Sequence, residues 1–199
     1  MKCLIVAAGQ GSRMRDQGDS KPLIEIDGIP ILERVILNLR DGGIDDFYIV
    51  TGYRGTKVRA FLDELSDRES IKINHVVNEE WQRPNGLSVY AARDHIDGPF
   101  ILTMCDHLFD PEIIRDVLLA EHDEGTVTLC VDYNIENPVI DIDDVTRVNC
   151  TGNEIRNIGK VIRDYNAFDT GIFYCTSAMF DALDKSFKEG DESITGAMN

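Results

Sequence analysis

A glycine-containing turn near the N-terminus carries residues suited to binding phosphate. Gly9 and Gly11 directly follow an apolar run, and glycine lets the backbone approach phosphate oxygens closely and offer N–H groups to them. Arg13 and Lys21 add two cations where a polyphosphate would carry its charge. The segment is neither GxxxxGK[ST] nor a GxGxxG that opens a helix, which argues against a P-loop and against a dinucleotide-binding oxidoreductase.

An aspartate at the end of an apolar strand pattern is the second chemical signal. Asp106 follows the apolar run at 100–104, and in open α/β sheets ligands bind at the carboxyl ends of the strands. A carboxylate is a hard oxygen ligand suited to Mg²⁺, so Asp106 is the candidate metal ligand, with a loop or capping aspartate as the alternative. His107 is interpreted as a contact to substrate or to the metal's ligands, or else as a surface histidine.

The elements that must position these residues alternate between strand and helix. We expect a helix with Pro30 in its first turn, ending at Gly42-Gly43. The remaining patterns predict strands at 2–8, 47–51, 71–77 and 100–104 and helices at 56–66, 87–94 and 111–122, the last one capped by Asp110. This order predicts a Rossmann-like α/β fold, a mixed and mostly parallel sheet flanked by helices. Later strand-like pieces at 126–132, 139–149 and 168–175 predict a mixed or antiparallel part, and Ser193 is a candidate helix N-cap.

Composition bounds the function classes. The chain has 199 residues, 43% of them hydrophobic, which suits a single domain with its own core. Its net charge of −16 argues against a nucleic-acid partner. No apolar run approaches the roughly 20 residues of a membrane span, so we expect no membrane insertion by this chain. Five scattered cysteines without a CxxC pair predict buried thiols and a cytoplasmic location rather than disulfides or a zinc site.

The N-terminal segment resembles a family signature. Leu4-Ile5-Val6-Ala7-Ala8-Gly9-x-Gly11-Ser12-Arg13-Met14, followed by Lys21-Pro22-Leu23, is similar to the signature of the sugar-phosphate nucleotidyltransferases. The resemblance implies the nucleotide-diphospho-sugar transferase fold, a nucleoside triphosphate substrate and Mg²⁺ as cofactor. It also implies a nucleotide-binding set at Ala8, Gly9, Gly11, Ser12, Arg13 and Lys21, with Asp106 holding the metal.

The resemblance extends into the rest of the chain. Asn85-Gly86-Leu87-Ser88 matches the family segment that reads the nucleobase, which makes Asn85, Gly86 and Ser88 candidates; a loop with a helix N-cap is the alternative. Lys160 fits the lysine that holds the acceptor's phosphate, unless it is a solvated surface lysine. Asp169 and Thr170 fit the strand that lines the acceptor hydroxyls, with His107 as a further acceptor contact. Catalysis is assigned to Arg13, Lys21 and Lys160.

The subfamily of highest similarity is the archaeal and bacterial CTP:inositol-1-phosphate cytidylyltransferases. Gly159-Lys160, Tyr165–Gly171 and Cys105-Asp106-His107 carry this similarity. It implies transfer of a cytidylyl group from CTP to inositol 1-phosphate, with a membrane CDP-alcohol phosphotransferase as a fused or paired partner. Choline phosphate, a hexose 1-phosphate or molybdopterin are alternative acceptors, and a non-catalytic regulatory relative is an alternative class.

One family segment is missing from the sequence. A Trp-x-Asp-x-Asp-Thr-like stretch, whose acid completes the metal site in family members, has no counterpart before Asn199. We therefore expect a domain that lacks a C-terminal segment, with Asp169 or a partner supplying the second metal ligand.

Overall fold

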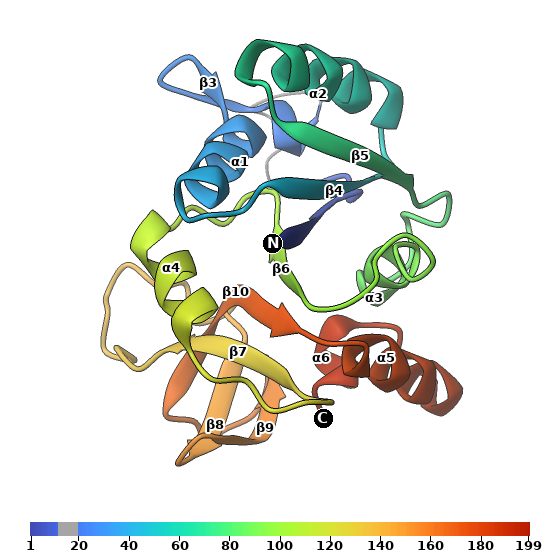
Figure 1. Cartoon of the computed structure of the whole chain (residues 1–199). Coiled ribbons are helices and arrows are strands. Elements are labelled where there is room, and N and C mark those ends of the chain that lie inside the picture. The colour runs from blue at the N-terminus through green and yellow to red at the C-terminus, as the bar shows by residue number, and fades with distance from the viewer. Residues whose placement is uncertain (12–19) are drawn as a thin grey trace.

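The computed structural model describes residues 1–11 and 20–199 and contains an eight-stranded sheet flanked by helices (Figure 1). The strand order is β5-β4-β1-β6-β10-β8-β9, and β7 also pairs with β10. The strands of this sheet are β1 (Lys2–Ala7), β4 (Asp46–Thr51), β5 (Lys72–Val77), β6 (Phe100–Met104), β7 (Val127–Asp132), β8 (Arg147–Thr151), β9 (Glu154–Gly159) and β10 (Ala167–Cys175). The other elements are the 3₁₀ helix η2 (Lys21–Leu23), the small hairpin β2 (Glu25–Ile26) and β3 (Ile29–Pro30), and the helices α1 (Ile31–Asp41), α2 (Gly55–Glu69), α3 (Gly86–Tyr90), α4 (Pro111–Leu119), α5 (Ala178–Glu189) and α6 (Ile194–Ala197).

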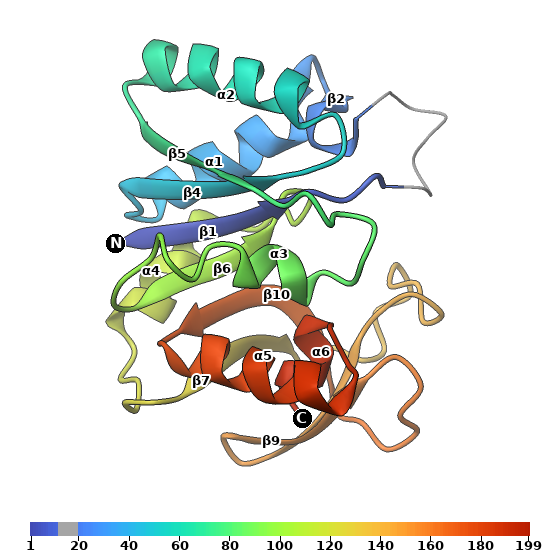
Figure 2. The same cartoon turned by 90° about the vertical axis from the view of Figure 1, so that its right-hand side faces the viewer.

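The first half of the sheet is parallel because its strands are buried on both faces. Strand β1 lies between β4 and β6 and runs parallel to both. Its alternate residues enter different cores: Leu4 and Val6 pack with α3 and α5, and Cys3 and Ile5 pack with α1, α2 and α4. Figure 2 shows the helices on the two sides of the sheet. The predicted mostly parallel sheet with flanking helices is confirmed.

The second half of the sheet is antiparallel and is joined to the first by β10. This strand pairs with β6, β7 and β8, and its pairing with β7 shifts register between Asp169 and Phe173. Strands β8 and β9 form a hairpin in which Gly152 has a positive φ of 60°, a conformation that glycine adopts without strain. The predicted change from parallel to antiparallel after residue 125 is therefore correct.

Two predicted elements differ from the structure. The strand expected at 139–149 begins only at Arg147. Backbone N–H groups of Val139 and Asp143 bind the side chains of Asn137 and Asp141, so short polar side chains form local turns in place of a strand ladder. The helix expected at 87–94 ends at Tyr90, because the next residues continue in tighter turns with i→i−3 hydrogen bonds.

Other local predictions agree with the structure or require small changes. Asp110 caps α4 by accepting a hydrogen bond from the Glu112 backbone, and Ser193 caps α6 in the same way through the Gly196 backbone. Pro30 lies one residue before α1 rather than in its first turn. The strand β9 and the helix α5 were not predicted.

Two expectations drawn from composition concern cysteines and membrane spans. All five cysteines are free thiols, and three of them are buried. In the described ranges, no helix combines the length and the apolar character needed to cross a bilayer.

The core under α1 supplies a test of the fold. Leu39 is fully buried, whereas Leu119 at the end of α4 is 84% exposed. Replacing Leu39 with alanine should lower the free energy of unfolding by about 2–5 kcal/mol, because it removes buried methyl groups and leaves a cavity. The matched change Leu119→Ala should alter it by less than about 0.5 kcal/mol in urea denaturation. Equal losses in the two variants would contradict the packing described here.

Candidate active site

A cavity of about 460 Å³ opens at the carboxyl ends of β1 and β6. The two strands are parallel neighbours, with Val6 paired to Met104, so the segments that follow them emerge side by side. Gly9, Gly11 and Asp106 all line this cavity. The two strongest chemical signals of the sequence, which are far apart in the chain, thus meet at one edge of the sheet, where open α/β sheets bind ligands.

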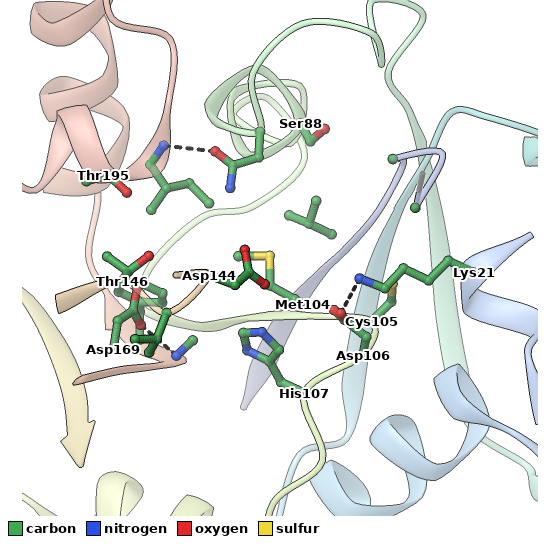
Figure 3. Close-up of a pocket in the computed structure, with 18 of the residues that line it drawn as sticks. Lys21, Ser88, Met104, Cys105, Asp106, His107, Asp144, Thr146, Asp169 and Thr195 are labelled. Atoms are coloured by element: carbon green, nitrogen blue, oxygen red, sulfur yellow. Dashed lines mark hydrogen bonds and ion pairs between the residues drawn. The ribbon is translucent and has the colours of Figure 1, made fainter. Parts of the chain in front are cut away.

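Lys21 and Asp106 form an ion pair inside the cavity (Figure 3). About a quarter of the Asp106 side chain is exposed, so the pair is neither fully buried nor freely solvated. Gly11 permits the arrangement: its φ is +64°, and a Cβ atom at this position would lie 2.6 Å from the Lys21 Cβ. The glycine of the turn therefore makes room for the lysine that reaches the aspartate.

The nucleobase candidates lie on α3 and the loop before it. Asn85 and Ser88 line the cavity, together with Trp81 and Arg83 of the same segment. Gly86 does not line the cavity. It lies against the C-terminal segment instead, where a side chain at this position would collide with the Glu192 backbone carbonyl. We therefore ascribe to Gly86 the close packing of α3 against the C-terminal segment rather than a contact to ligand.

His107 and Asp169 line the part of the cavity that lies away from Ser88 (Figure 3). Asp169 accepts a hydrogen bond from the Gly171 backbone at 2.6 Å. Burial raises the pKa of the Asp169 carboxyl, and the Gly171 N–H and the nearby His107 partly offset this. Gly171, with φ +73°, leaves no space for a Cβ because the His107 ring occupies it. Thr170 points elsewhere, with its hydroxyl donating to the Cys130 carbonyl at 2.7 Å.

Lys160 also lines the cavity, where it donates to Asp144 at 2.7 Å. Asp144 and Thr146 belong to the turn-rich segment before β8, and Thr195 reaches the cavity from α6. The sequence did not identify Asp144, Thr146 and Thr195 as site residues, nor Trp81 and Arg83. Trp81 and Arg83 could have been found from their position beside Asn85, whereas nothing in the sequence connects Thr195 to the site.

One predicted nucleotide-binding residue near the turn does not line the cavity. Ala8, which directly follows β1, is buried and is not among the lining residues. Ser12 and Arg13 lie outside the described residues, so their roles stay predictions.

The carboxylates of the cavity fit a magnesium ion that arrives with a nucleotide. Within residues 1–11 and 20–199, no group of three or more acidic, histidine or cysteine side chains is arranged to hold a metal by itself. Mg²⁺ is commonly bound by one or two carboxylates plus substrate phosphates and waters, and Asp106 would supply such an oxygen ligand beside the turn that contains Gly9 and Gly11. Cys105 does not compete, because burial raises the pKa of its thiol to about 12.

Known proteins resemble this chain over most of its length. Residues 3–153 match the family model of the MobA-like NTP transferase domain. A bifunctional IPC transferase and DIPP synthase from Rubrobacter xylanophilus is 33% identical over 181 residues, 90% of this chain and 39% of that protein. Its namesake from Aquifex aeolicus is 30% identical over 94% of this chain and 41% of that protein. The chain therefore spans about two fifths of the length of these curated relatives.

The solved structures include a counterpart for the whole fold. The inositol-1-phosphate CTP transferase from T. maritima superposes with a TM-score of 0.86 at 26% sequence identity. The match covers 99% of this chain and 79% of that one.

The buried carboxyl of Asp169 yields a prediction on stability against pH. The pKa of this carboxyl is raised in the folded state, so between its unfolded and folded pKa values the native protein holds a proton that the unfolded chain has released. The free energy of unfolding therefore falls as the pH rises from the ordinary pKa of aspartate to the raised one. Asp169→Asn, which keeps an acceptor for the Gly171 N–H, should therefore be more stable than wild type at pH about 7. The advantage should shrink toward pH about 4, near the ordinary pKa of aspartate. Urea denaturation at both pH values, with the exposed Asp164→Asn as control, measures it; a gain independent of pH would contradict it.

Proposed function

The chain belongs to the family of MobA-like NTP transferase domains, and from this premise we propose that it transfers a cytidylyl group from CTP to inositol 1-phosphate and releases pyrophosphate. The observation that carries the proposal is one cavity lined by the phosphate-binding turn, by Lys21 and Asp106, and by Lys160 and Asp169. The activities for which the relatives and the T. maritima structure are named support this choice of substrates.

The reaction is an in-line displacement at the α-phosphorus of CTP. An oxygen of the acceptor's phosphate forms a bond to the α-phosphorus, and the bond from that phosphorus to the bridging oxygen of the β-phosphate breaks. The bridging oxygen keeps the electron pair and leaves with pyrophosphate. A phosphate monoester is already ionised at neutral pH, so no strong general base is needed, and positioning and charge stabilisation provide the catalysis.

Each charged side chain of the cavity has one task in this reaction. Lys21 stabilises the negative charge on the α-phosphate and the leaving group. Asp106 would hold the divalent ion that nucleotidyltransferases typically use, here proposed to be Mg²⁺, which when bound neutralises charge on the triphosphate. Lys160 orients the acceptor's phosphate, and Asp169 accepts hydrogen bonds from acceptor hydroxyls. The predicted roles of Arg13 and Ser12 complete the triphosphate site.

We also propose a cytoplasmic location and a place before a CDP-alcohol phosphotransferase. Five free thiols fit a reducing compartment. The relatives are named for a second activity, DIPP synthase, and this chain spans about two fifths of their length. The product, a CDP-activated polyol, is what a phosphotransferase fused or paired with the domain would consume.

The lysine of the ion pair provides the first kinetic test. Lys21→Ala should lower kcat/KM by about 10²–10³, by analogy with the removal of one transition-state donor. The exposed Lys57→Ala should keep full activity. Pyrophosphate release with CTP and inositol 1-phosphate measures both, and a Lys21→Ala enzyme within threefold of wild type would remove Lys21 from the mechanism. Absence of release by wild type with CTP, UTP and the alternative acceptors would instead favour a regulatory nucleotide-binding relative.

The aspartate of the ion pair tests the metal assignment. Asp106→Asn replaces an anionic ligand by a neutral one of the same shape, so activity should need roughly tenfold or more Mg²⁺ to reach half its maximum. The same change at the exposed Asp116 should leave the Mg²⁺ titration unchanged. If the two titrations coincide, the ion binds elsewhere.

A further inference from the structure

The side-chain amide of Asn85 has a fixed polarity. The Ile194 backbone N–H lies 3.1 Å from Asn85 Oδ1, and a backbone N–H can only donate. The amide oxygen must therefore face Ile194, and the Nδ2 group must be turned away from it. Because Asn85 lines the cavity, the group that it can offer a ligand there is a hydrogen-bond donor.

Ser88 is polarised by a similar chain of contacts. The Glu80 backbone N–H donates to Asn78 Oδ1 at 2.9 Å, which forces Asn78 Nδ2 to donate to Ser88 Oγ, also at 2.9 Å. Both side chains of this second contact are buried. Since Ser88 Oγ accepts from Asn78, its own proton remains available for a ligand. Ser88 also lines the cavity, so it supplies a second donor.

The C-terminal segment holds this arrangement in place. Arg83 pairs with Glu192, with its Nε 3.1 Å from the carboxylate. Gly86 packs so closely on the Glu192 carbonyl that no side chain fits between them. Ile194, the residue that orients Asn85, follows Glu192 by two positions and is buried. Three contacts thus fix residues 192–194 against the segment that carries Asn85.

We propose that Asn78 and the Ile194 backbone are positioning groups that make Asn85 and Ser88 a donor–donor pair selecting cytosine over uracil. The inference rests on the proposed function, in that it assigns this end of the cavity to the base of the nucleotide. Cytosine presents two adjacent acceptors, N3 and O2, on its pairing edge. Uracil carries a proton on N3, and a donor opposite it is left unpaired, which costs binding free energy.

Nucleotide binding without acceptor tests the proposal apart from turnover. Trp81 is the one tryptophan in the sequence and lines the cavity, so its fluorescence can report dissociation constants for CTP and UTP in the presence of Mg²⁺. Asn85→Asp keeps the acceptor for Ile194 and turns an oxygen, not a donor, toward the base. The ratio of UTP to CTP dissociation constants should fall about 10–100-fold relative to wild type. The added charge weakens both nucleotides alike and cancels in the ratio.

Two further variants make the result decisive. Asn85→Ala should weaken CTP binding without creating a preference for UTP, and Asn157→Asp, the same isosteric change at an exposed position of β9, should leave the ratio unchanged. An Asn85→Asp ratio equal to that of wild type, or a wild type that binds CTP and UTP equally, would overturn the inference. Selective CTP binding without pyrophosphate release would overturn the proposed function instead and leave this inference standing.

Discussion

The site depends on the contact between a lysine after β1 and an aspartate after β6. Lys21 and Asp106 can meet only because β1 and β6 are parallel neighbours whose carboxyl ends share one edge. The positive charge of Lys21 offsets the negative charge of Asp106, whose side chain is only partly exposed to solvent. The ion pair also holds two groups of opposite charge where the α-phosphate and its metal would lie. The remaining parts of the fold bring to this point the segments that we propose to read the base and to hold the acceptor.

The other described cations of the cavity wall are paired with carboxylates as well. Lys160 pairs with Asp144, and Arg83 pairs with Glu192. In a chain of net charge −16, paired cations attract a bare polyphosphate less strongly than free cations would. Under the proposed function, a nucleotide with its divalent ion would exchange partners with the Lys21 pair, because the carboxylate would hold the ion and the lysine would contact the phosphates.

Local sequence patterns predicted the parts of the fold that local physics decides. The apolar runs of β1 and β6, the cap at Asp110 and the turn at Gly9–Gly11 follow from residue type and spacing, and so does the meeting of Asp106 with that turn. The segment at 139–146 was misread because apolar content alone does not show that Asn137 and Asp141 bind the neighbouring backbone. The role of Ile194 depends on a contact between residues 109 positions apart, which no local pattern encodes.

Strand β10 links the two halves of the sheet through its pairing with β6 on one side and with β7 and β8 of the antiparallel half. Gly9, Lys21 and Asp106 follow the parallel strands or their loops, whereas Asp144, Thr146 and Lys160 come from turns and hairpins beyond β10. Under the proposed function, substitutions in these turns would change the choice of acceptor without altering the residues that contact the triphosphate. One fold can host different activities in this way, because function depends on the residues that the fold presents.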